Sequence, residues 1–360
     1  MKLLLPVAGM SSRFPGLRPK YLLTFPDGKL MIQKAIENID FSRYSEVIVG
    51  PHVDHINKYI SIEQLIDVMS ESISNFDLPI RVIPIHNSTS QADTCLQLLE
   101  ELKDDFSFGI KDCDNVFSFP FCEGNAIAYV NLNDKSLSSL SSPASKSYVE
   151  IDSLGSIKAI AEKRVISSQF ACGYYQFSSS HEFTNVAKGL IEGFSNDGHE
   201  KVEIYISNCI FSMLTSGKIF KSLRSDFYQD FGDLDSFNAL RKSALSIFCD
   251  FDGVLVKNSS KFDSPPWQFI PIEKNINALA LKLSEDPASK LVITTSRPAR
   301  LKQEIFTFLA DKGLACTEII CDLPHSRRLL INDYANSNPY PSCSSISIKR
   351  DASNLSDFLV

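Results

Sequence analysis

The sequence lacks the features that mark several large classes of protein. None of its nine cysteines is spaced as Cys-x-x-Cys, which excludes the usual zinc motifs and gives no obvious disulfide framework. No apolar run approaches the roughly 20 residues that a membrane-spanning helix needs. Lys and Arg number 36 against 43 Asp and Glu, for a net charge of −7, whereas a general nucleic-acid binder needs a concentrated excess of basic residues. We therefore expect neither membrane insertion nor a nucleic-acid partner.

What is present is the composition of a globular protein. Hydrophobic residues make up 44% and charged residues 22% of the 360 residues, a balance that supports two or three domains. The first apolar run reaches Pro6 after about four residues, while the core of a secretory leader needs roughly 7–15. Together with the scattered cysteines, this predicts a reducing, cytoplasmic location.

Apolar runs alternate with helix-like stretches along the chain. Glu46–Gly50 and Phe106–Ile110 are typical of buried strands, and Met31–Ile39 and Ala92–Leu102 are typical of helices. Strands that alternate with helices of this length predict βαβ units and therefore an α/β fold.

Two runs have the character of a domain's first strand, because each ends in a polar loop: Lys2–Val7 and Leu245–Asp250. Before the second we expect a helix at Ile219–Phe231 and a domain boundary near Phe237–Ser243. The predicted domains are residues 1–243 and 244–360, each of a size that can bury a single core.

A loop of small residues follows the first strand. Small residues at the carboxyl end of a strand let backbone N–H groups approach an anion, and Arg13 and Lys20 would add charge-assisted bonds to phosphate oxygens. A tight strand-to-helix turn with solvated cations would explain the same residues. Neither the Walker A pattern nor the Rossmann glycine pattern occurs here.

A carboxylate pair, Asp112 and Asp114, follows the run at residues 106–110. Carboxylates at positions i and i+2 on the end of a strand point the same way and can bind Mg²⁺, although such a pair also occurs in ordinary acidic loops. Asp112 and Asp114 are therefore candidate metal ligands.

The whole opening phrase resembles the sugar-phosphate nucleotidyltransferases, the family that makes nucleoside-diphosphate sugars and related activated alcohols. The resemblance rests on Gly9, Ser11, Arg13, Pro19-Lys20 and the apolar Tyr21-Leu-Leu, and extends with less detail to about residue 230. It implies a glycosyltransferase-A-like mixed sheet for the first domain. It also implies Mg²⁺-dependent attack of a substrate phosphate on the α-phosphorus of an NTP, with release of pyrophosphate.

The family pattern assigns roles to individual residues. Lys20 and Arg13 would be catalytic. Asp114 would be the first choice as the metal ligand and Asp112 the second, and Glu203 is the substitute for a second metal-ligating Asp, since Ile206 or Ser207 stands at the expected place. The nucleotide would contact Ala8, Gly9, Ser11, Ser12, Gln91 and Asp112, and the acceptor substrate would contact Glu162, Lys163 and Gly173.

A second motif, Asp250-Phe-Asp252-Gly, ends the apolar run at residues 245–250. It resembles the haloacid dehalogenase superfamily of phosphatases and implies a parallel sheet with little or no cap. Asp250 would be the nucleophile that forms an aspartyl-phosphate, and Asp252 the general acid and base. Thr295, or alternatively Thr294, would bond the phosphoryl group, and Arg327 or Arg328 would replace the usual Lys. Mg²⁺ would be held by the Asp250 side chain, the Asp252 backbone carbonyl and Asp333, which ends an expected strand, Leu329–Asp333.

Together the motifs predict two Rossmann-like domains in a bifunctional enzyme for activated-sugar precursors of capsule or surface polysaccharide. The substrates would be an NTP, a sugar or alcohol phosphate, and a phosphomonoester, and an oligomer is left open. One alternative is a phosphatase whose first domain binds nucleotide but turns it over weakly. Another is a glycosyltransferase-like first domain, against which Arg13 and Lys20 argue, since an already activated sugar has no triphosphate to hold.

Overall fold

A computed structural model of the chain describes residues 1–134, 143–196, 203–333 and 342–359. The chain divides into two compact units, Met1–Phe237 and Asn238–Val360. The point of division falls inside helix α7 (Leu234–Ser243), whose last residue is the predicted end of the first domain. Among the described helices, none has the length and apolar character needed to cross a membrane.

The first unit is built on a mixed nine-stranded sheet in the order β10-β6-β9-β4-β1-β2-β3, with β7 paired to β9 and β8 paired to β7. Strand β1 runs parallel to β2 and β4, while β9 runs antiparallel to β4 and β6. The strands are β1 (Lys2–Val7), β2 (Glu46–Pro51), β3 (Ile80–Val82), β4 (Phe108–Lys111), β6 (Ala126–Asn131), β7 (Tyr148–Ile151), β8 (Ile157–Ala161), β9 (Gln169–Phe177) and β10 (Lys221–Arg224).

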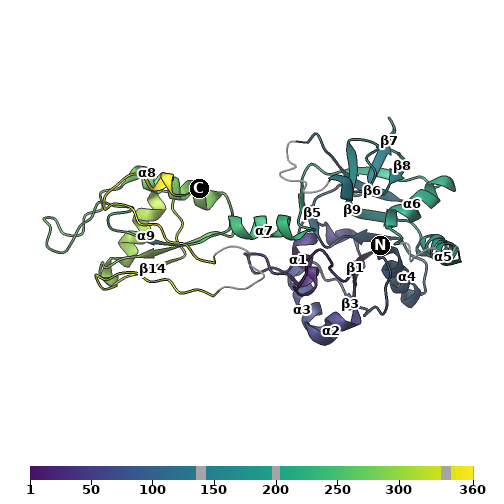
Figure 1. Cartoon of the computed structure of the whole chain (residues 1–360), viewed down its shortest axis with the longest axis horizontal. Coiled ribbons are helices and arrows are strands. Elements are labelled where there is room, and N and C mark those ends of the chain that lie inside the picture. The colour runs from purple at the N-terminus through teal and green to yellow at the C-terminus, as the bar shows by residue number, and fades with distance from the viewer. Residues whose placement is uncertain (135–142, 197–202, 334–341, 360) are drawn as a thin grey trace. The chain divides into compact units, whose positions relative to one another are not determined.

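Helices cover both faces of this sheet, as Figure 1 shows. Helices α4, α5 and α6 lie on one face and α1, α2 and α3 on the other. Along β1, Leu4 belongs to the core under the first group, whereas Leu3 and Leu5 belong to the core under the second. Both faces of the strand are thus buried, which is why it reads as an unbroken apolar run. The helices are α1 (Met31–Ala35), α2 (Val53–Lys58), α3 (Ile62–Ser72), α4 (Gln91–Leu102), α5 (Ser180–Asn196) and α6 (Ile206–Thr215).

A two-stranded antiparallel pair, β5 (Asn115–Phe117) and β11 (Tyr228–Asp230), lies beside the main sheet. The helix predicted at 219–231 is wrong, because this stretch forms β10 and β11 instead. Its large side chains Phe220, Leu223, Tyr228 and Phe231 are buried, but a turn at Ser225 interrupts the stretch between the two strands. The Ser225 hydroxyl donates to the Phe227 carbonyl at 2.6 Å in this turn.

The order of the strands fixes where a ligand can bind. The chain passes from β1 to β2 on one side, whereas β4 lies on the other side of β1. Loops that leave β1 and β4 at their carboxyl ends therefore diverge and leave a crevice, the usual ligand position in open α/β sheets. The predicted phosphate loop and the predicted Asp pair are these two loops.

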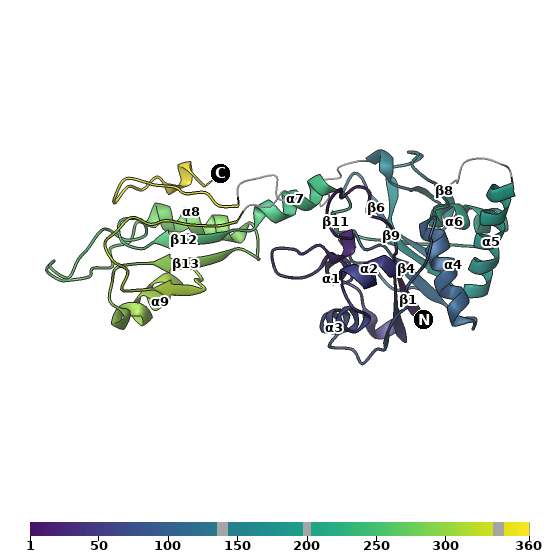
Figure 2. The ribbon, with the colours of Figure 1, turned by 60° about the horizontal axis from the view of Figure 1, so that its bottom comes forward.

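The second unit contains a three-stranded parallel sheet in the order β12-β13-β14. Its strands are β12 (Ser246–Asp250), β13 (Lys290–Thr294) and β14 (Glu318–Ile320), and the helices α8 (Glu273–Ser284) and α9 (Lys302–Asp311) connect them in turn, as can be followed in Figure 2. The strand predicted at 329–333 is wrong. Leu329 and Ile331 are 78% and 88% exposed, and these residues have no strand hydrogen bonding, so the third strand is β14.

Candidate active site

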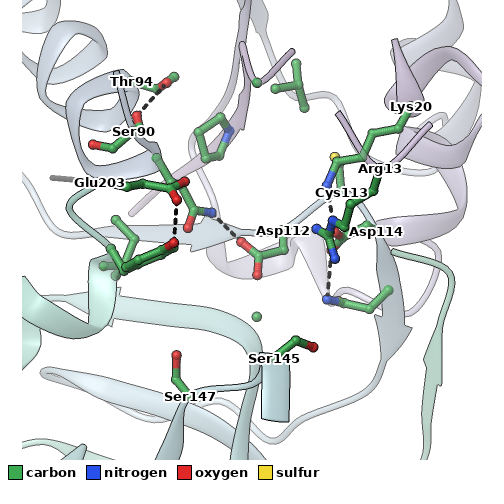
Figure 3. Close-up of a pocket in the computed structure, with 18 of the residues that line it drawn as sticks. Arg13, Lys20, Ser90, Thr94, Asp112, Cys113, Asp114, Ser145, Ser147 and Glu203 are labelled. Carbon is green, nitrogen blue, oxygen red and sulfur yellow. Dashed lines mark hydrogen bonds and ion pairs between the residues drawn. The ribbon is translucent and has the colours of Figure 1, made fainter. Parts of the chain in front are cut away.

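A polar cavity of about 630 Å³ opens in the crevice beside β1 and β4. Figure 3 shows Arg13 and Lys20 beside Asp114, Glu203 at the opposite side, and Asp112 between them in this view. Of the predicted residues of the first domain, all but one line this cavity: Gly9, Ser11, Ser12, Arg13, Lys20, Gln91, Asp112, Asp114, Glu162, Lys163, Gly173 and Glu203. The exception is Ala8, which is buried in the core next to the loop.

The loop after β1 turns back so that its two cations face one carboxylate. Ser11 adopts the left-handed backbone region, with φ 54°, and its hydroxyl accepts the backbone N–H of Lys20 at 2.9 Å. This bond fixes the end of the loop where η1 (Lys20–Leu22) begins. Lys20 Nζ lies 2.7 Å and Arg13 Nη2 3.5 Å from Asp114 Oδ2.

Electrostatics distinguish the two carboxylates of the predicted pair. Burial alone would raise the pKa of Asp114, but the charges of Lys20 and Lys146 outweigh it and hold that pKa well below its usual range. Burial and the charge of Asp114 raise the pKa of Asp112 to about 6. One carboxylate is therefore firmly ionised beside a neighbour that is harder to ionise.

Asp112 is held from two directions. Gln91, the first residue of α4, donates from Nε2 to Asp112 Oδ1, and the backbone N–H of Asp112 donates to the Gly173 carbonyl at 2.8 Å. Gly173 has φ +96°, and a Cβ there would lie 2.6 Å from Asp112 Oδ2 and 2.8 Å from Asn115 Nδ2. This position requires glycine because the strand backbone touches the carboxylate turn.

The opposite end of the cavity carries acids supported by hydroxyl groups. Glu162 Oε2 accepts from the hydroxyls of Ser147 and Ser207, the second at 2.6 Å. Lys163 Nζ and Glu203 both bond the Tyr205 hydroxyl. Glu162 and Lys163 follow directly after β8 rather than lying on it.

Sequence reasoning missed a third carboxylate close to Asp114. The β5–β11 ladder places Asp230 opposite Asn115, and Asp230 forms an ion pair with Lys146, which also donates to the Tyr228 hydroxyl at 3.1 Å. The only local signal is that Asp230 stands two residues before Gly232, at the end of a short strand that begins with Tyr228. No sequence pattern indicates that Asp230 lies beside the turn that carries Asp114.

Carboxylate oxygens of this region could hold Mg²⁺. A Cβ on Gly232 would lie 3.0 Å from Asp114 Oδ2 and 3.1 Å from Asp230 Oδ1, so the Gly232 backbone lies against both carboxylates and a side chain there would crowd them. Across the described residues, no three His, Cys, Asp or Glu side chains gather into a metal-binding group. Mg²⁺ is commonly held by one or two carboxylates together with substrate phosphates and water, and this donor set fits that pattern.

The second motif has a different environment. Asp250 ends β12 opposite Thr294. Its side chain is 48% exposed, and Arg328 Nη2 lies 4.0 Å from Oδ1. Burial raises the pKa of Asp250, against the charge of Arg328. Asp250 and Arg328 are thus near one another, as the sequence predicts for a phosphate site.

Asp252 instead points into the unit. Arg297 Nε lies 3.1 Å and 3.2 Å from its two oxygens, Arg297 Nη2 donates at 2.8 Å, and Thr295 Oγ1 donates at 2.9 Å. Arg297 is completely buried and also donates to the carbonyls of Trp267 and Gln268 at 2.9 Å and 2.6 Å. Thr295 and Asp252 are therefore brought together, but in a closed network.

Asp333 does not join this group. It is exposed, and its carbonyl accepts from the Ser342 hydroxyl. The described residues contain no cluster of three metal-ligating side chains, but the expected site uses the backbone carbonyl of Asp252 rather than its side chain, so binding of Mg²⁺ by Asp250, Asp252 and Asp333 stays a prediction. The strand expected at 329–333, which was to carry Asp333 to the sheet edge, does not form.

No protein-family model matches this sequence, and no curated protein sequence matches it. The fold, however, is similar to that of solved structures. A nucleoside-diphosphate-sugar pyrophosphorylase from Vibrio cholerae RC9 is 17% identical, covers 67% of this chain and 99% of its own, and has a TM-score of 0.53. A protein assigned as a glucose-1-phosphate thymidylyltransferase from Bacillus anthracis, in complex with a sucrose, is 16% identical, covers 67% and 93%, and has a TM-score of 0.50. At such identities the likeness shows a nucleotidyltransferase-like fold for about two thirds of the chain.

Proposed function

We propose that the first unit transfers a nucleotidyl group from an NTP to a sugar or alcohol phosphate. The observation that carries this proposal is the convergence of Lys20, Arg13, Asp112 and Asp114 in one polar cavity at the carboxyl ends of β1 and β4. Two cations on a loop of small residues suit a triphosphate, and the fold supports the same assignment.

In the proposed reaction an oxygen of the acceptor phosphate attacks the α-phosphorus, and the bond to the β-phosphate bridging oxygen breaks. Pyrophosphate leaves with the electron pair. Lys20 and Arg13 would stabilise the negative charge that develops on the phosphoryl oxygens, and the N–H groups around Gly9 would orient the triphosphate. Catalysis of this kind consists of positioning and charge stabilisation and requires no nucleophilic side chain.

Asp114, with Asp112 or Asp230, would hold Mg²⁺, which when bound supplies positive charge for the triphosphate. At the other end of the cavity, Glu162 and Lys163 would bind the acceptor. The Oε2 atom of Glu162 is already occupied by two serine hydroxyls, so Oε1 is the atom left to accept from an acceptor hydroxyl. Glu203 as a second metal ligand stays a prediction, as does the contact of Gly173 with the acceptor.

A second activity, phosphomonoester hydrolysis by the second unit, is proposed from one observation: Asp250 is half-exposed at a strand end with Arg328 nearby. An Asp250 oxygen would attack phosphorus and the protonated alcohol would leave, and water would then attack the aspartyl-phosphate to release phosphate and free Asp250. Asp252 can take its predicted proton-transfer role only after it separates from Arg297. Hydrolysis of 4-nitrophenyl phosphate that survives Asp250→Asn unchanged would end this proposal.

The two activities together would serve the synthesis of activated precursors for capsule or other surface polysaccharide in the cytoplasm. This setting is proposed from the pairing of the two motifs and from the scattered, free cysteines.

The test of the main proposal supplies Mg²⁺, the four common NTPs singly, and a pool of sugar and alcohol phosphates. We expect pyrophosphate release with one base, together with an equal amount of a nucleoside-diphosphate-linked product by mass spectrometry. Nucleotide binding without any such product would instead support a binding role for the first unit.

A further inference from the structure

Lys111, the last residue of β4, is a cation that the proposed reaction does not use. Its side chain is completely buried. It lies behind the turn that carries Asp112 and Asp114, and it is not among the residues that line the cavity. A buried lysine is costly unless each of its donors is satisfied, so its contacts indicate its role.

All three Nζ donors are used within one short turn. Nζ donates to the carbonyl of Asp112 at 2.7 Å, to the carbonyl of Asn115 at 2.9 Å and to Asn115 Oδ1 at 2.7 Å. None of these acceptors is a carboxylate. The Lys111 side chain therefore holds the two ends of the turn together through the backbone carbonyls of the turn, and both carboxylates remain directed to the cavity.

The contacts continue from Lys111 to the catalytic turn through one amide. Asn115 is 3% exposed, and while its Oδ1 accepts from Lys111, its Nδ2 lies 3.3 Å from Asp114 Oδ1. Lys111 thus fixes which way the Asn115 amide faces, and the amide faces Asp114. The positive charge of Lys111 also lies close to two carboxylates that repel one another.

We propose that Lys111 is a positioning residue for the nucleotidyl-transfer site, which holds the Asp112–Asn115 turn so that Asp112 and Asp114 present their oxygens together to metal and phosphate. The proposal rests on the proposed function of the first unit. Lys20 and Arg13 meet the substrate directly, whereas Lys111 acts through the turn and never touches the substrate.

The experiment compares Lys111→Met, which keeps the length of the side chain and removes its charge and donors, with Lys158→Met. Lys158 is a lysine of the same unit whose side chain is 63% exposed and pairs with Asp152. Calorimetry measures binding of Mn²⁺ with pyrophosphate to each full-length protein, with no turnover required. We expect at least tenfold weaker binding for Lys111→Met and unchanged binding for Lys158→Met, both with wild-type circular dichroism.

Wild-type affinity in folded Lys111→Met would overturn the proposal. If that variant does not fold, Lys111→Gln carries the same comparison, and failure of both to fold would overturn positioning in favour of a purely structural role. The proposed function fails separately, if the wild type binds Mn²⁺ with pyrophosphate but makes no product from any NTP.

Discussion

The chain contains two Asp-x-Asp turns, each at the end of a strand, and the fold uses them in opposite ways. Asp112 and Asp114 both face a cavity of about 630 Å³, with Lys20 and Arg13 at its edge. In the second turn only Asp250 faces outward, while Asp252 is bound by the buried Arg297. The same local pattern lines a polar cavity in one unit and joins a core network in the other.

The difference lies in the exposure of the positively charged partner of each carboxylate. Lys20 lies on a loop beside a cavity and keeps 22% of its side chain exposed, so a phosphate can share it with Asp114. Arg297 is completely buried among Phe251, Trp267 and Phe269 and has no access to a ligand. The two turns therefore differ in whether the cation paired with the carboxylate also faces a cavity.

The largest expected effect concerns the first turn. Lys20→Ala should reduce nucleotidyl transfer by about 10³-fold, because it removes a charge aimed at the reacting phosphate. Pyrophosphate release measures this. Lys29→Ala, a nearby exposed lysine paired with Glu37, is the control and should keep wild-type activity. Equal activity in both variants would contradict the role of Lys20.

The next effect concerns stability in the second turn. Arg297→Met leaves Asp252 as a buried carboxylate without its partner, which should lower the free energy of unfolding of the second unit by about 3–5 kcal/mol. Urea denaturation followed by the fluorescence of Trp267, the sole tryptophan of the chain, measures it. A loss below about 1 kcal/mol would mean that the Arg297–Asp252 pair contributes little to the stability of the second unit.

A pH experiment sharpens the contrast within the first turn. The pKa of Asp112 is raised to about 6, above its unfolded value near 4, so the folded chain binds more protons in this window. The contribution of Asp112 to stability should therefore fall as pH rises from about 4 to about 6, by about 1.4 kcal/mol per unit of pKa shift. Asp112→Asn should remove this slope from melting temperatures measured at each pH, and an unchanged slope would contradict the assignment.

The smallest effect concerns what supports the second turn. Asn275 is completely buried and donates to the carbonyls of Val254 and Ala352 at 2.7 Å and 2.8 Å, while it accepts the Leu355 N–H at 3.0 Å. It thereby ties the C-terminal segment to the turn. Asn275→Ala should lower the stability of the second unit by about 2 kcal/mol, and denaturation midpoints equal to wild type would show that the segment is held by other contacts.

Local sequence predicted the parts of the site that local chemistry determines. The strand Lys2–Val7, the loop with Arg13 and Lys20, and the turn with Asp112 and Asp114 could be read directly, because each lies within a few residues of a strand end. The mixed sheet of the first unit was also predicted, through the family resemblance, and is confirmed.

Pairings distant in sequence could not be predicted in the same way. Asp230 reaches Asp114 only through the β5–β11 ladder, and Arg297 reaches Asp252 across 45 residues. Lys111 reads as one more residue of a buried strand, and only the structure shows that its ammonium group turns back into the loop it precedes. Leu329–Ile331 has a strand-like composition but pairs with nothing that would bury it, and the structure leaves it exposed.

The most direct test of the central claim compares pyrophosphate release by two matched variants, Asp114→Asn and Asp250→Asn. Each replaces one carboxylate of an Asp-x-Asp turn by its isosteric amide. The account predicts that release with the preferred NTP is lost in Asp114→Asn and remains at the wild-type rate in Asp250→Asn. Release that survives Asp114→Asn, or that is lost in a folded Asp250→Asn protein, would contradict it.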